Sequence, residues 1–151
     1  MNIKRAARAV IVDENNLIAL IDVRDGEYYK IPGGGIESDE TEEEAAKRES
    51  LEEAGCQIEI LGKIGEQQFA DNNPDYGDMI HHSVCFLAKK IGEQADTNFD
   101  DWEQSNKMKL IWVSFPEAID LFSKVNTSDY FGSQINKRDF EFVVKAQKMI
   151  L

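Results

Sequence analysis

The feature that most constrains the fold is a glycine-rich turn followed closely by a strongly acidic segment. Residues 32–35 read Pro-Gly-Gly-Gly, a composition that cannot continue a regular element and that predicts a loop with an open backbone. Thr41 and Glu44 then have the spacing of a capping box, which begins a helix, and Gly55 is the residue type that ends one. The sequence therefore predicts a loop followed by a helix that begins at Thr41 and ends at Gly55.

Apolar runs and polar turns alternate along the rest of the chain. The apolar runs predict strands over residues 3–13, 17–24, 27–31, 57–66, 83–90 and 108–113. Residues 71–78 and 92–106 are polar and predict connecting loops. Capping residues and apolar spacing predict two further helices, over about residues 114–124 and 138–150. No linker or internal repeat interrupts this pattern, so we expect an α/β fold and a single domain over residues 1–151.

Charge and composition exclude several classes of function. The formal net charge of −12 argues against a nucleic-acid duplex as partner, because its phosphates would be repelled. A small phosphorylated substrate stays compatible with this charge if bound metal ions invert the local field. No apolar run approaches the ~18 residues of a membrane helix, and the N-terminus lacks the apolar stretch of a signal peptide. We therefore expect a cytoplasmic protein with no membrane contact.

The acidic helix predicts a metal site. Glu49, Glu52 and Glu53 are related by three and four residues, so they lie on one face of the predicted helix. Like charges so placed destabilise an isolated helix by about 0.2–0.5 kcal/mol per pair. A divalent cation that takes hard oxygen ligands would reverse the sign of this interaction. The pattern favours Mg²⁺, which is held by a few carboxylates together with substrate phosphates and water.

Arg48 lies within the same helix and is positioned to brace its acidic side. It follows Glu44 by four residues and precedes Glu52 by four, which are spacings that allow ion pairs on a helix. It could also reach Glu40 if the loop before the helix folds back. The predicted role of Arg48 is to orient carboxylates.

The residues from Gly34 to Cys56 resemble the signature of the Nudix (MutT-like) hydrolase family, G-x5-E-x7-R-E-U-x-E-E-x-G-U, in which U is apolar. All of the fixed positions match, and they are Gly34, Glu40, Arg48, Glu49, Glu52, Glu53 and Gly55. Ser50 departs from the pattern, because an aliphatic residue is usual there. We expect its hydroxyl to bond back to the carbonyl of Ala46 at a small cost in stability. The resemblance implies an α/β/α sandwich with a mixed central sheet.

The resemblance also implies a reaction and a metal site. The family hydrolyses a nucleoside diphosphate linked to another group, X, by attack of water at phosphorus. Glu49, Glu52 and Glu53 would then ligate Mg²⁺ or Mn²⁺, and the carbonyl of Gly34 would add a further oxygen. Arg48 would belong to the catalytic set through its effect on these carboxylates.

The general base varies among members of the family, so the resemblance leaves it open. It is either a glutamate of the signature, for which we choose Glu52, or an acidic residue from a later loop. Glu103 is the first candidate in that loop, and Asp100 and Asp101 compete with it.

Substrate contacts are predicted less sharply than the metal site. Arg8, Arg24 and Lys30 are cations near strands that approach the signature loop, and they are candidates for binding phosphate. His81 and His82 open a strand, where neighbours face opposite ways, so both cannot line one site. The resemblance implies a small nucleotide as substrate but does not identify X. Because family members are often dimers, it also leaves a homodimer open.

Two alternatives to an enzyme are compatible with the same sequence. The first is a nucleotide-sensing module that uses the fold to bind without cutting, and the intact set of glutamates speaks against it. The second is an acidic interaction domain, which would show no Mg²⁺-dependent shift in thermal stability. The leading hypothesis is an active diphosphate hydrolase.

Overall fold

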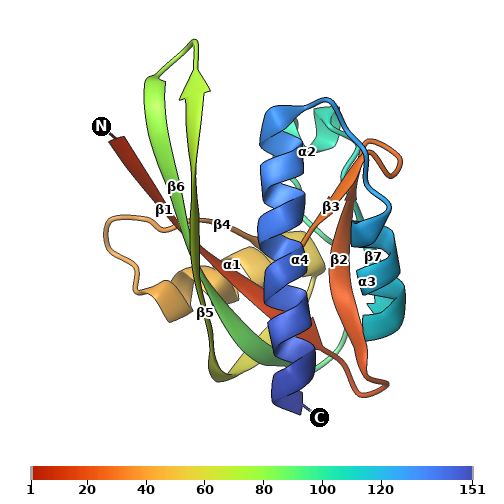
Figure 1. Cartoon of the computed structure of the whole chain (residues 1–151). Helices are drawn as coiled ribbons and strands as arrows, with labels where there is room; N and C mark the ends of the chain where they lie inside the picture. The colour runs from red at the N-terminus through yellow and green to blue at the C-terminus, as the bar shows by residue number, and fades with distance from the viewer. Residues whose placement is uncertain (1, 151) are drawn as a thin grey trace.

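The computed structural model describes residues 2–150 (Figure 1). The elements follow in the order β1 (Asn2–Val12), β2 (Leu17–Val23), β3 (Tyr28–Lys30), β4 (Gly33–Gly35), α1 (Glu42–Ala54), β5 (Gln57–Asn73), β6 (Gly77–Ile91), α2 (Asp101–Ser105), β7 (Lys109–Ser114), α3 (Phe115–Ser123) and α4 (Tyr130–Ile150). Within this range no helix is long and apolar enough to cross a membrane.

One mixed sheet forms the centre of the fold. Its strands run in the order β3-β2-β1-β6-β5, with β4 paired to β1 and β7 paired to β2. β1 and β6 are parallel along the whole of β1, and the other pairs are antiparallel. β1 pairs with β2 only at Val12 and Ile18, and β4 then takes a place beside β1. The divergence of β1 and β2 leaves room for a site next to the glycines.

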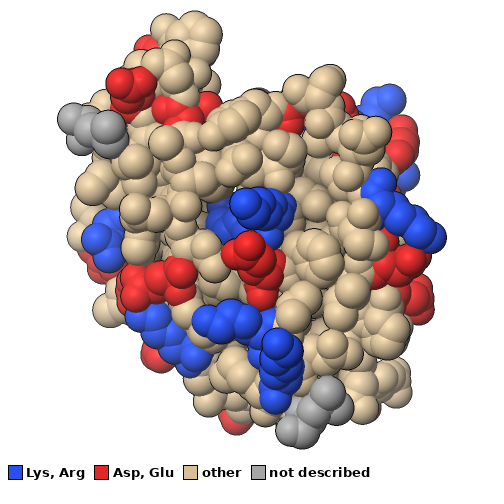
Figure 2. Space-filling view, viewed as in Figure 1, with Lys and Arg blue, Asp and Glu red and all other residues tan. Residues whose placement is uncertain are grey.

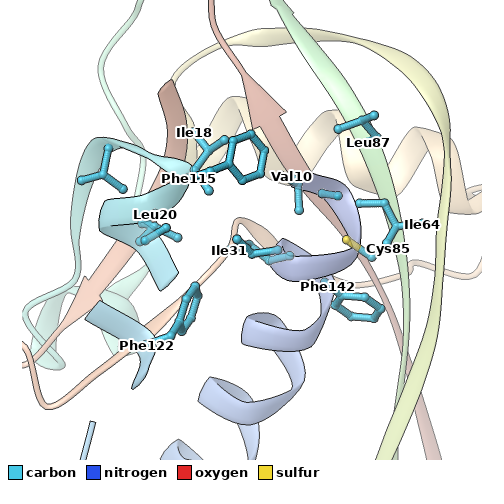
Figure 3. Close-up of a cluster of buried hydrophobic side chains, with 14 residues drawn as sticks. Val10, Ile18, Leu20, Ile31, Ile64, Cys85, Leu87, Phe115, Phe122 and Phe142 are labelled. Atoms are coloured by element: carbon cyan, nitrogen blue, oxygen red, sulfur yellow. The ribbon is translucent and has the colours of Figure 1, made fainter. Parts of the chain in front are cut away.

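Helices cover both faces of the sheet, which confirms the predicted α/β/α arrangement (Figure 1). Alternate residues of β6 show the two sides, because neighbours in a strand point in opposite directions. Cys85 and Leu87 pack with α3 and α4 in the largest core cluster (Figure 3). Val84 and Phe86 pack with Ala45 and Ala46 of α1.

Helix α1 begins and ends as the sequence predicts. Thr41 and Glu44 form a reciprocal capping box, and Gly55 ends the helix in the left-handed conformation with φ of 60°. A Cβ at Gly55 would lie 2.1 Å from the carbonyl oxygen of Ala95. Any side chain at this position would therefore collide with the segment that contains Ala95. The N–H of Ala95 donates to the carbonyl of Gly55 (2.7 Å), and the N–H of Asn98 donates to that of Glu52 (2.6 Å). These bonds bring the segment before α2 against the end of α1.

The predicted loop over residues 32–35 is wrong for the three glycines. They form the short strand β4, whose partners are Ala6, Ala7 and Arg8 of β1. A Cβ at Gly33 would lie 2.4 Å from Cγ of Arg8 and 2.6 Å from the carbonyl oxygen of Ala7. Glycine is needed here because the two backbones and the Arg8 side chain lie closer together than any larger residue allows.

Three other segments differ from their predicted structure. Most of the predicted loop over residues 71–78 belongs to the long hairpin of β5 and β6, whose polar tip projects beyond the body of the fold (Figure 1). The predicted loop over residues 92–106 contains the short helix α2. Helix α4 begins at Tyr130 rather than near residue 138, although Gly132 and Ser133 have low helix propensity. Gly132 packs directly against the ring of Tyr28, so tertiary contact outweighs that propensity.

The predicted bond from Ser50 to the carbonyl of Ala46 is also wrong. The Ser50 hydroxyl is buried and has no hydrogen-bond partner among residues 2–150. A buried polar group without a partner costs about 1–3 kcal/mol. The departure from the aliphatic residue usual at this position therefore carries the full cost of an unpaired hydroxyl.

We expect Ser50→Ala to increase the free energy of unfolding by about 1 kcal/mol, because it removes this hydroxyl and leaves little empty space. For a chain of this size the melting temperature should rise by about 2–4 °C. Urea titration and thermal melting measure both quantities. Ser133→Ala is the matched control in a helix, because its hydroxyl donates to the carbonyl of Tyr130 (2.9 Å). A lower stability for Ser50→Ala than for the native chain would contradict the prediction.

Candidate active site

A cavity of about 770 Å³ opens between β4, the end of α1, the first residues of β1 and the segment that carries α2. Glutamates, cations and aromatic side chains all line it. On the face shown in Figure 2 the described acidic and basic side chains are interspersed, without a continuous basic surface. Acidic and basic side chains therefore meet inside the cavity, and the face shown has no continuous basic surface.

Glu53 is the most deeply placed carboxylate of the cavity, with 1% of its surface exposed. The N–H of Gly33 donates to it (3.0 Å), and Nζ of Lys30 lies 3.4 Å from both of its oxygens. Burial alone would raise the pKa of Glu53, but Lys30, a hydrogen bond with Glu103 and the N–H of Gly33 outweigh it and lower this pKa. Glu53 is therefore ionised and joins α1 to the strand of glycines.

Glu49 lies directly against Gly34. A Cβ at Gly34 would lie 2.5 Å from Oε1 of Glu49, so only glycine lets the carboxylate and the backbone come together. Nη1 of Arg48 donates to the same oxygen (2.8 Å). Burial, and then the negative charge of Glu53, raise the pKa of Glu49. Glu49 is therefore held against the backbone of Gly34 by close packing and by Arg48.

Arg48 binds the loop before α1 as well as the helix itself. It donates to Glu40 from Nε (2.6 Å) and to the carbonyl of Gly35 from Nη2 (2.9 Å). Its Nη1 contacts Glu49 and lies 3.5 Å from Glu52. The hydrogen bonds from Arg48 lower the pKa of Glu40 to about 2. Arg48 thus contacts the carboxylates of Glu40, Glu49 and Glu52, and its contact with Glu40 shows that the loop folds back.

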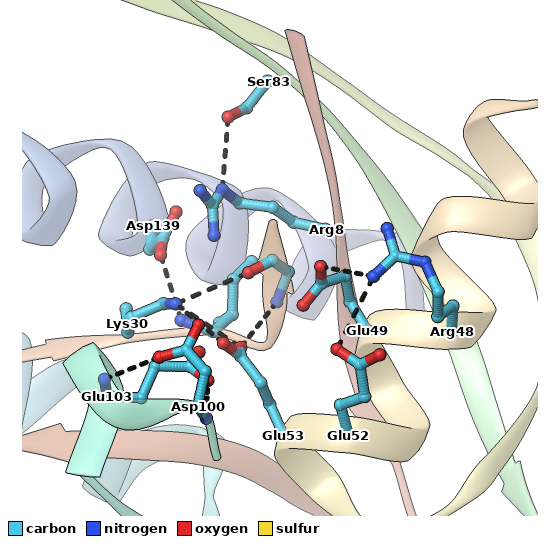
Figure 4. A network of polar contacts seen from close by, with 12 residues as sticks. Arg8, Lys30, Arg48, Glu49, Glu52, Glu53, Ser83, Asp100, Glu103 and Asp139 are labelled. Carbon is cyan, nitrogen blue, oxygen red and sulfur yellow. Dashed lines mark hydrogen bonds and ion pairs between the residues drawn. The ribbon is translucent and has the colours of Figure 1, made fainter. Parts of the chain in front are cut away.

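Helix α2 brings Glu103 to the buried end of α1 (Figure 4). Burial, and then a hydrogen bond with the Glu53 carboxylate, raise the pKa of Glu103 to about 8. Asp100 also lines the cavity, but its carboxylate caps α2 by accepting from the N–H of Glu103 (2.8 Å). Asp101 is not among the lining residues. Of these three acidic residues, only Glu103 hydrogen-bonds a glutamate of α1.

The predicted phosphate contacts separate into two groups. Arg8 and Lys30 line the cavity, whereas Arg24 does not. Nε of Arg8 donates to Ser83 (3.2 Å), its Nη1 has no partner among residues 2–150, and burial followed by the charge of Arg138 lowers its pKa to about 10.

Arg24 is a structural residue outside the cavity. Its guanidinium contacts Glu27 and Asn106 and pairs with Asp129 (2.9 Å), which ties the turn between β2 and β3 to the segment before α4. The candidate role of Arg24 in phosphate binding stays a prediction, and the contacts of its side chain do not support it. Local sequence could not show this, because Asn106 and Asp129 are distant in the chain.

The donor set fits a hard divalent cation, although within residues 2–150 no three acidic, His or Cys side chains already stand in a metal-binding arrangement. Lys30 and Arg48 take up the carboxylates of Glu53 and Glu49 instead. Four glutamates line the same cavity, and they are Glu49, Glu52, Glu53 and Glu103. Because Gly34 carries no side chain, it leaves its own backbone open beside Glu49.

Sequence reasoning missed the other wall of the cavity. Asp71 lies in a segment predicted to be a loop, and Phe131 and Ile135 lie in the part of α4 that was not predicted. His81 lines the cavity, whereas His82 contacts Glu66 and Gln68 outside it, so the two histidines diverge as predicted. The opposite orientation expected for His81 and His82 in a strand was the one sequence signal for this wall.

Comparison with known proteins gives matches along most of the chain. The family model described as NUDIX domain matches residues 2–133. Nudix hydrolase 21, chloroplastic, of Arabidopsis thaliana is 35% identical over 113 residues, which are 75% of this chain and 53% of the relative. A putative 8-oxo-dGTP diphosphatase of Bacillus subtilis (strain 168) is 32% identical over 122 residues, covering 81% of this chain and 73% of the relative. The chain spans about half the length of the plant relatives, 45% of Nudix hydrolase 4 and 53% of Nudix hydrolase 21.

Solved structures show the same architecture. A UDP-X diphosphatase aligns with a TM-score of 0.63 at 19% identity, covering 100% of this chain and 66% of that one. A hydrolase from Nitrosomonas europaea aligns with a TM-score of 0.60 at 18% identity, covering 91% and 88%. At these identities the likeness concerns the fold, and it confirms the predicted α/β class.

Proposed function

The chain belongs to the Nudix family, and on that premise we propose that it is a hydrolase that cleaves a diphosphate linkage in a nucleoside diphosphate derivative. The observation that carries the proposal is the meeting of Glu49, Glu52 and Glu53 with Gly34 and Glu103 in one cavity. A cavity of about 770 Å³ is large enough for a nucleotide, since small-molecule sites range from about 300 to 1,000 Å³. Relatives whose names include diphosphatase and pyrophosphatase support the same reaction class.

Mg²⁺ is the proposed cofactor, with Mn²⁺ as the alternative ion. Glu49, Glu52, Glu53 and the carbonyl of Gly34 would hold it, because they offer the hard oxygens that such ions prefer. When bound, the ion supplies positive charge that polarises the phosphoryl oxygens and lowers the pKa of an attacking water. Side chains of the protein itself would supply the general base and the contacts to phosphate.

We assign the general base to Glu52. Its side chain is 40% exposed and its contact with Arg48 is 3.5 Å long, so it is open to a water in the cavity. Glu53 is occupied by Lys30 and the N–H of Gly33, and Glu103 is hydrogen-bonded to Glu53. Glu52 would accept the proton from water as the water oxygen bonds to phosphorus and the bridging phosphorus–oxygen bond breaks. Both products carry a phosphate group.

Arg8 and Lys30 are the proposed phosphate contacts. Nη1 of Arg8 is buried and has no partner among residues 2–150, so it can donate a hydrogen bond to an anion in the cavity. Lys30 lies beside Gly33 and Glu53, next to the proposed metal ligands. Arg48 would keep Glu49 and Glu52 in position by its contacts to both.

The test is a Mg²⁺-dependent activity screen over nucleoside triphosphates, oxidised nucleotides, sugar nucleotides, ADP-ribose, dinucleoside polyphosphates and coenzyme A, with products identified. We expect turnover of at least one class, two phosphate-bearing products and loss of turnover when EDTA removes the metal. Tight nucleotide binding without product after long incubation would instead support the sensing module. The single domain, the cytoplasmic location and the homodimer stay predictions, and gel filtration tests the last.

A further inference from the structure

The cavity has a second end that the proposed reaction does not use. Lys4 pairs with His81 and Ala7 pairs with Gly34, so His81 lies about 10 Å along β1 from the glycine beside Glu49. Asp71 of β5 and Phe131 of α4 lie at the same end of the cavity as His81. A carboxylate beside aromatic rings is in a different environment from the glutamates of α1.

His81 is held at this end by packing. It is 7% exposed, its ring stacks on Phe69 with centroids 5.0 Å apart, and the ring of Phe131 lies 5.1 Å away. Its Nε2 is buried and forms no hydrogen bond within residues 2–150. Packing therefore fixes the ring, and its long contact with Asp71 (3.5 Å) leaves that carboxylate able to accept a further hydrogen bond.

Asp71 lies next to that nitrogen. Its Oδ2 is 3.5 Å from Nε2 of His81, and its side chain is 12% exposed. Burial, and then the charge of Lys4, lower the pKa of His81, so the imidazole is neutral at pH 7. No Lys or Arg of residues 2–150 forms an ion pair with this carboxylate. Asp71 is therefore a largely buried acceptor, without a cationic partner in that range, at the wall of a cavity.

We propose that Asp71, positioned by His81, is a specificity-determining residue that accepts a hydrogen bond from the nucleoside part of the substrate. The proposal rests on the proposed function, because it assigns the second end of the same cavity. An ionised carboxylate only accepts hydrogen bonds, so its partner must be an N–H or O–H group and cannot be a phosphate. Two parts of a nucleoside supply such donors, the edge of the base and the hydroxyls of ribose.

The surroundings of Asp71 suit the nucleoside better than the diphosphate. The ring of Phe131 and the side chain of Ile135 line this part of the cavity and can pack on a planar base. The glutamates of α1 lie toward the other end, where Glu49 lies against Gly34. This arrangement orients the substrate, with phosphates at the α1 end and the nucleoside at the hairpin end.

The test is equilibrium binding of nucleoside diphosphates in the presence of Mg²⁺, measured by calorimetry on the native chain and on Asp71→Asn. The panel is GDP, IDP, ADP and UDP, each with its 2′-deoxy counterpart. We expect the native chain to prefer one base over the others, or ribose over 2′-deoxyribose, by about 10- to 100-fold, which is the range for a hydrogen bond to a charged group. In Asp71→Asn that preference should fall to about threefold or less, since an amide no longer offers a full charge. Loss of a preference among bases identifies the base edge, and loss of a ribose preference identifies the sugar.

Asp78→Asn is the matched control. Asp78 lies on the same hairpin, is exposed and accepts from Nδ2 of Asn72 (2.6 Å), so its substitution removes the same charge away from the cavity. It should keep the native preferences. His81→Phe keeps the stack with Phe69 but removes both nitrogens, and it should weaken the preference. If thermal melting shows that Asp71→Asn does not fold, the His81→Phe variant provides the test instead.

Unchanged preferences in both Asp71→Asn and His81→Phe, or an equal loss for every nucleotide, would overturn the proposal. Because binding is measured without turnover, the experiment distinguishes a failure of this proposal from a failure of the proposed hydrolase. Asp71-dependent binding without any product would contradict the proposed hydrolase and support the proposed role of Asp71. Turnover whose nucleotide selectivity is the same in the native chain and in Asp71→Asn would support the proposed hydrolase and contradict the proposed role of Asp71.

Discussion

Glu52→Gln is expected to remove nearly all hydrolysis while the fold stays intact. The amide has nearly the shape of the carboxylate, but it cannot accept a proton at neutral pH or offer a negative charge to a cation. Loss of a group that acts on the reacting atoms reduces turnover by about 10²–10⁴-fold. Because the side chain is 40% exposed, the melting temperature should change little. Steady-state kinetics on the best substrate, together with thermal melting, measure the two effects.

Glu43→Gln is the control for this substitution. Glu43 is exposed in the first turn of the same helix and does not line the cavity, so turnover should be native. Glu53→Gln should lose activity as Glu52→Gln does, but it should also lose stability, because Lys30 would be left buried without its counter-charge. Native turnover in both Glu52→Gln and Glu53→Gln would refute the assigned mechanism.

Asp139→Asn is expected to have the largest effect on stability. Asp139 is fully buried, accepts from Nε of Arg138 (2.8 Å) and from the N–H of Ile31 (3.0 Å), and lies near Arg8. An asparagine can still accept from Ile31, but it leaves two buried guanidinium groups without a counter-charge. Removing one partner of a buried ion pair costs about 3–5 kcal/mol. Urea titration should show this loss in the free energy of unfolding.

The effect of Asp139 should depend on pH in a defined direction. Burial would raise its pKa, but Arg138 and Arg8 outweigh burial and hold this pKa below the usual 3.8. A carboxyl group with a lowered pKa stabilises the fold above its unfolded pKa, and this contribution is lost as the pH falls through the folded value. The difference between the native chain and Asp139→Asn should therefore be full at pH 7 and smaller at pH 3.

Asp120→Asn is the matched control for Asp139. Asp120 pairs with Lys124 (2.9 Å) on the surface of α3, where its side chain is 57% exposed. Exposed pairs of this kind contribute about 0–1 kcal/mol, so the loss should be small at either pH. Equal effects of the two substitutions at pH 7 would show that the buried charges are compensated in another way.

The parts of the site that the sequence predicted correctly are local. The cap at Thr41, the end at Gly55 and the shared face of Glu49, Glu52 and Glu53 follow from a helix period within one short segment. The contact of Arg48 with Glu52 spans four residues and follows from the same period. The resemblance to a known family also depends on this segment, so reaction class and fold class could be predicted together.

The second wall of the cavity depends on contacts between distant residues. Whether Arg8 or Arg24 enters the cavity is decided by the partners that reach each one, Ser83 in one case and Asp129 in the other. The hairpin that carries Asp71 has a polar sequence, because it projects beyond the core and is solvated on much of its surface. No hydrophobic alternation marks such a strand.

The sequence by itself determined the acidic helix, its caps and the spacing of its carboxylates, because each depends on residues within one or two helical turns. Only the tertiary structure decided that the glycines pair as a strand with β1, that Glu103 meets Glu53 and that Asp71 lies beside His81. Those contacts depend on sheet register and on how helices pack across the sheet. Register is set by the sum of many weak long-range interactions, and no short pattern of residues records that sum.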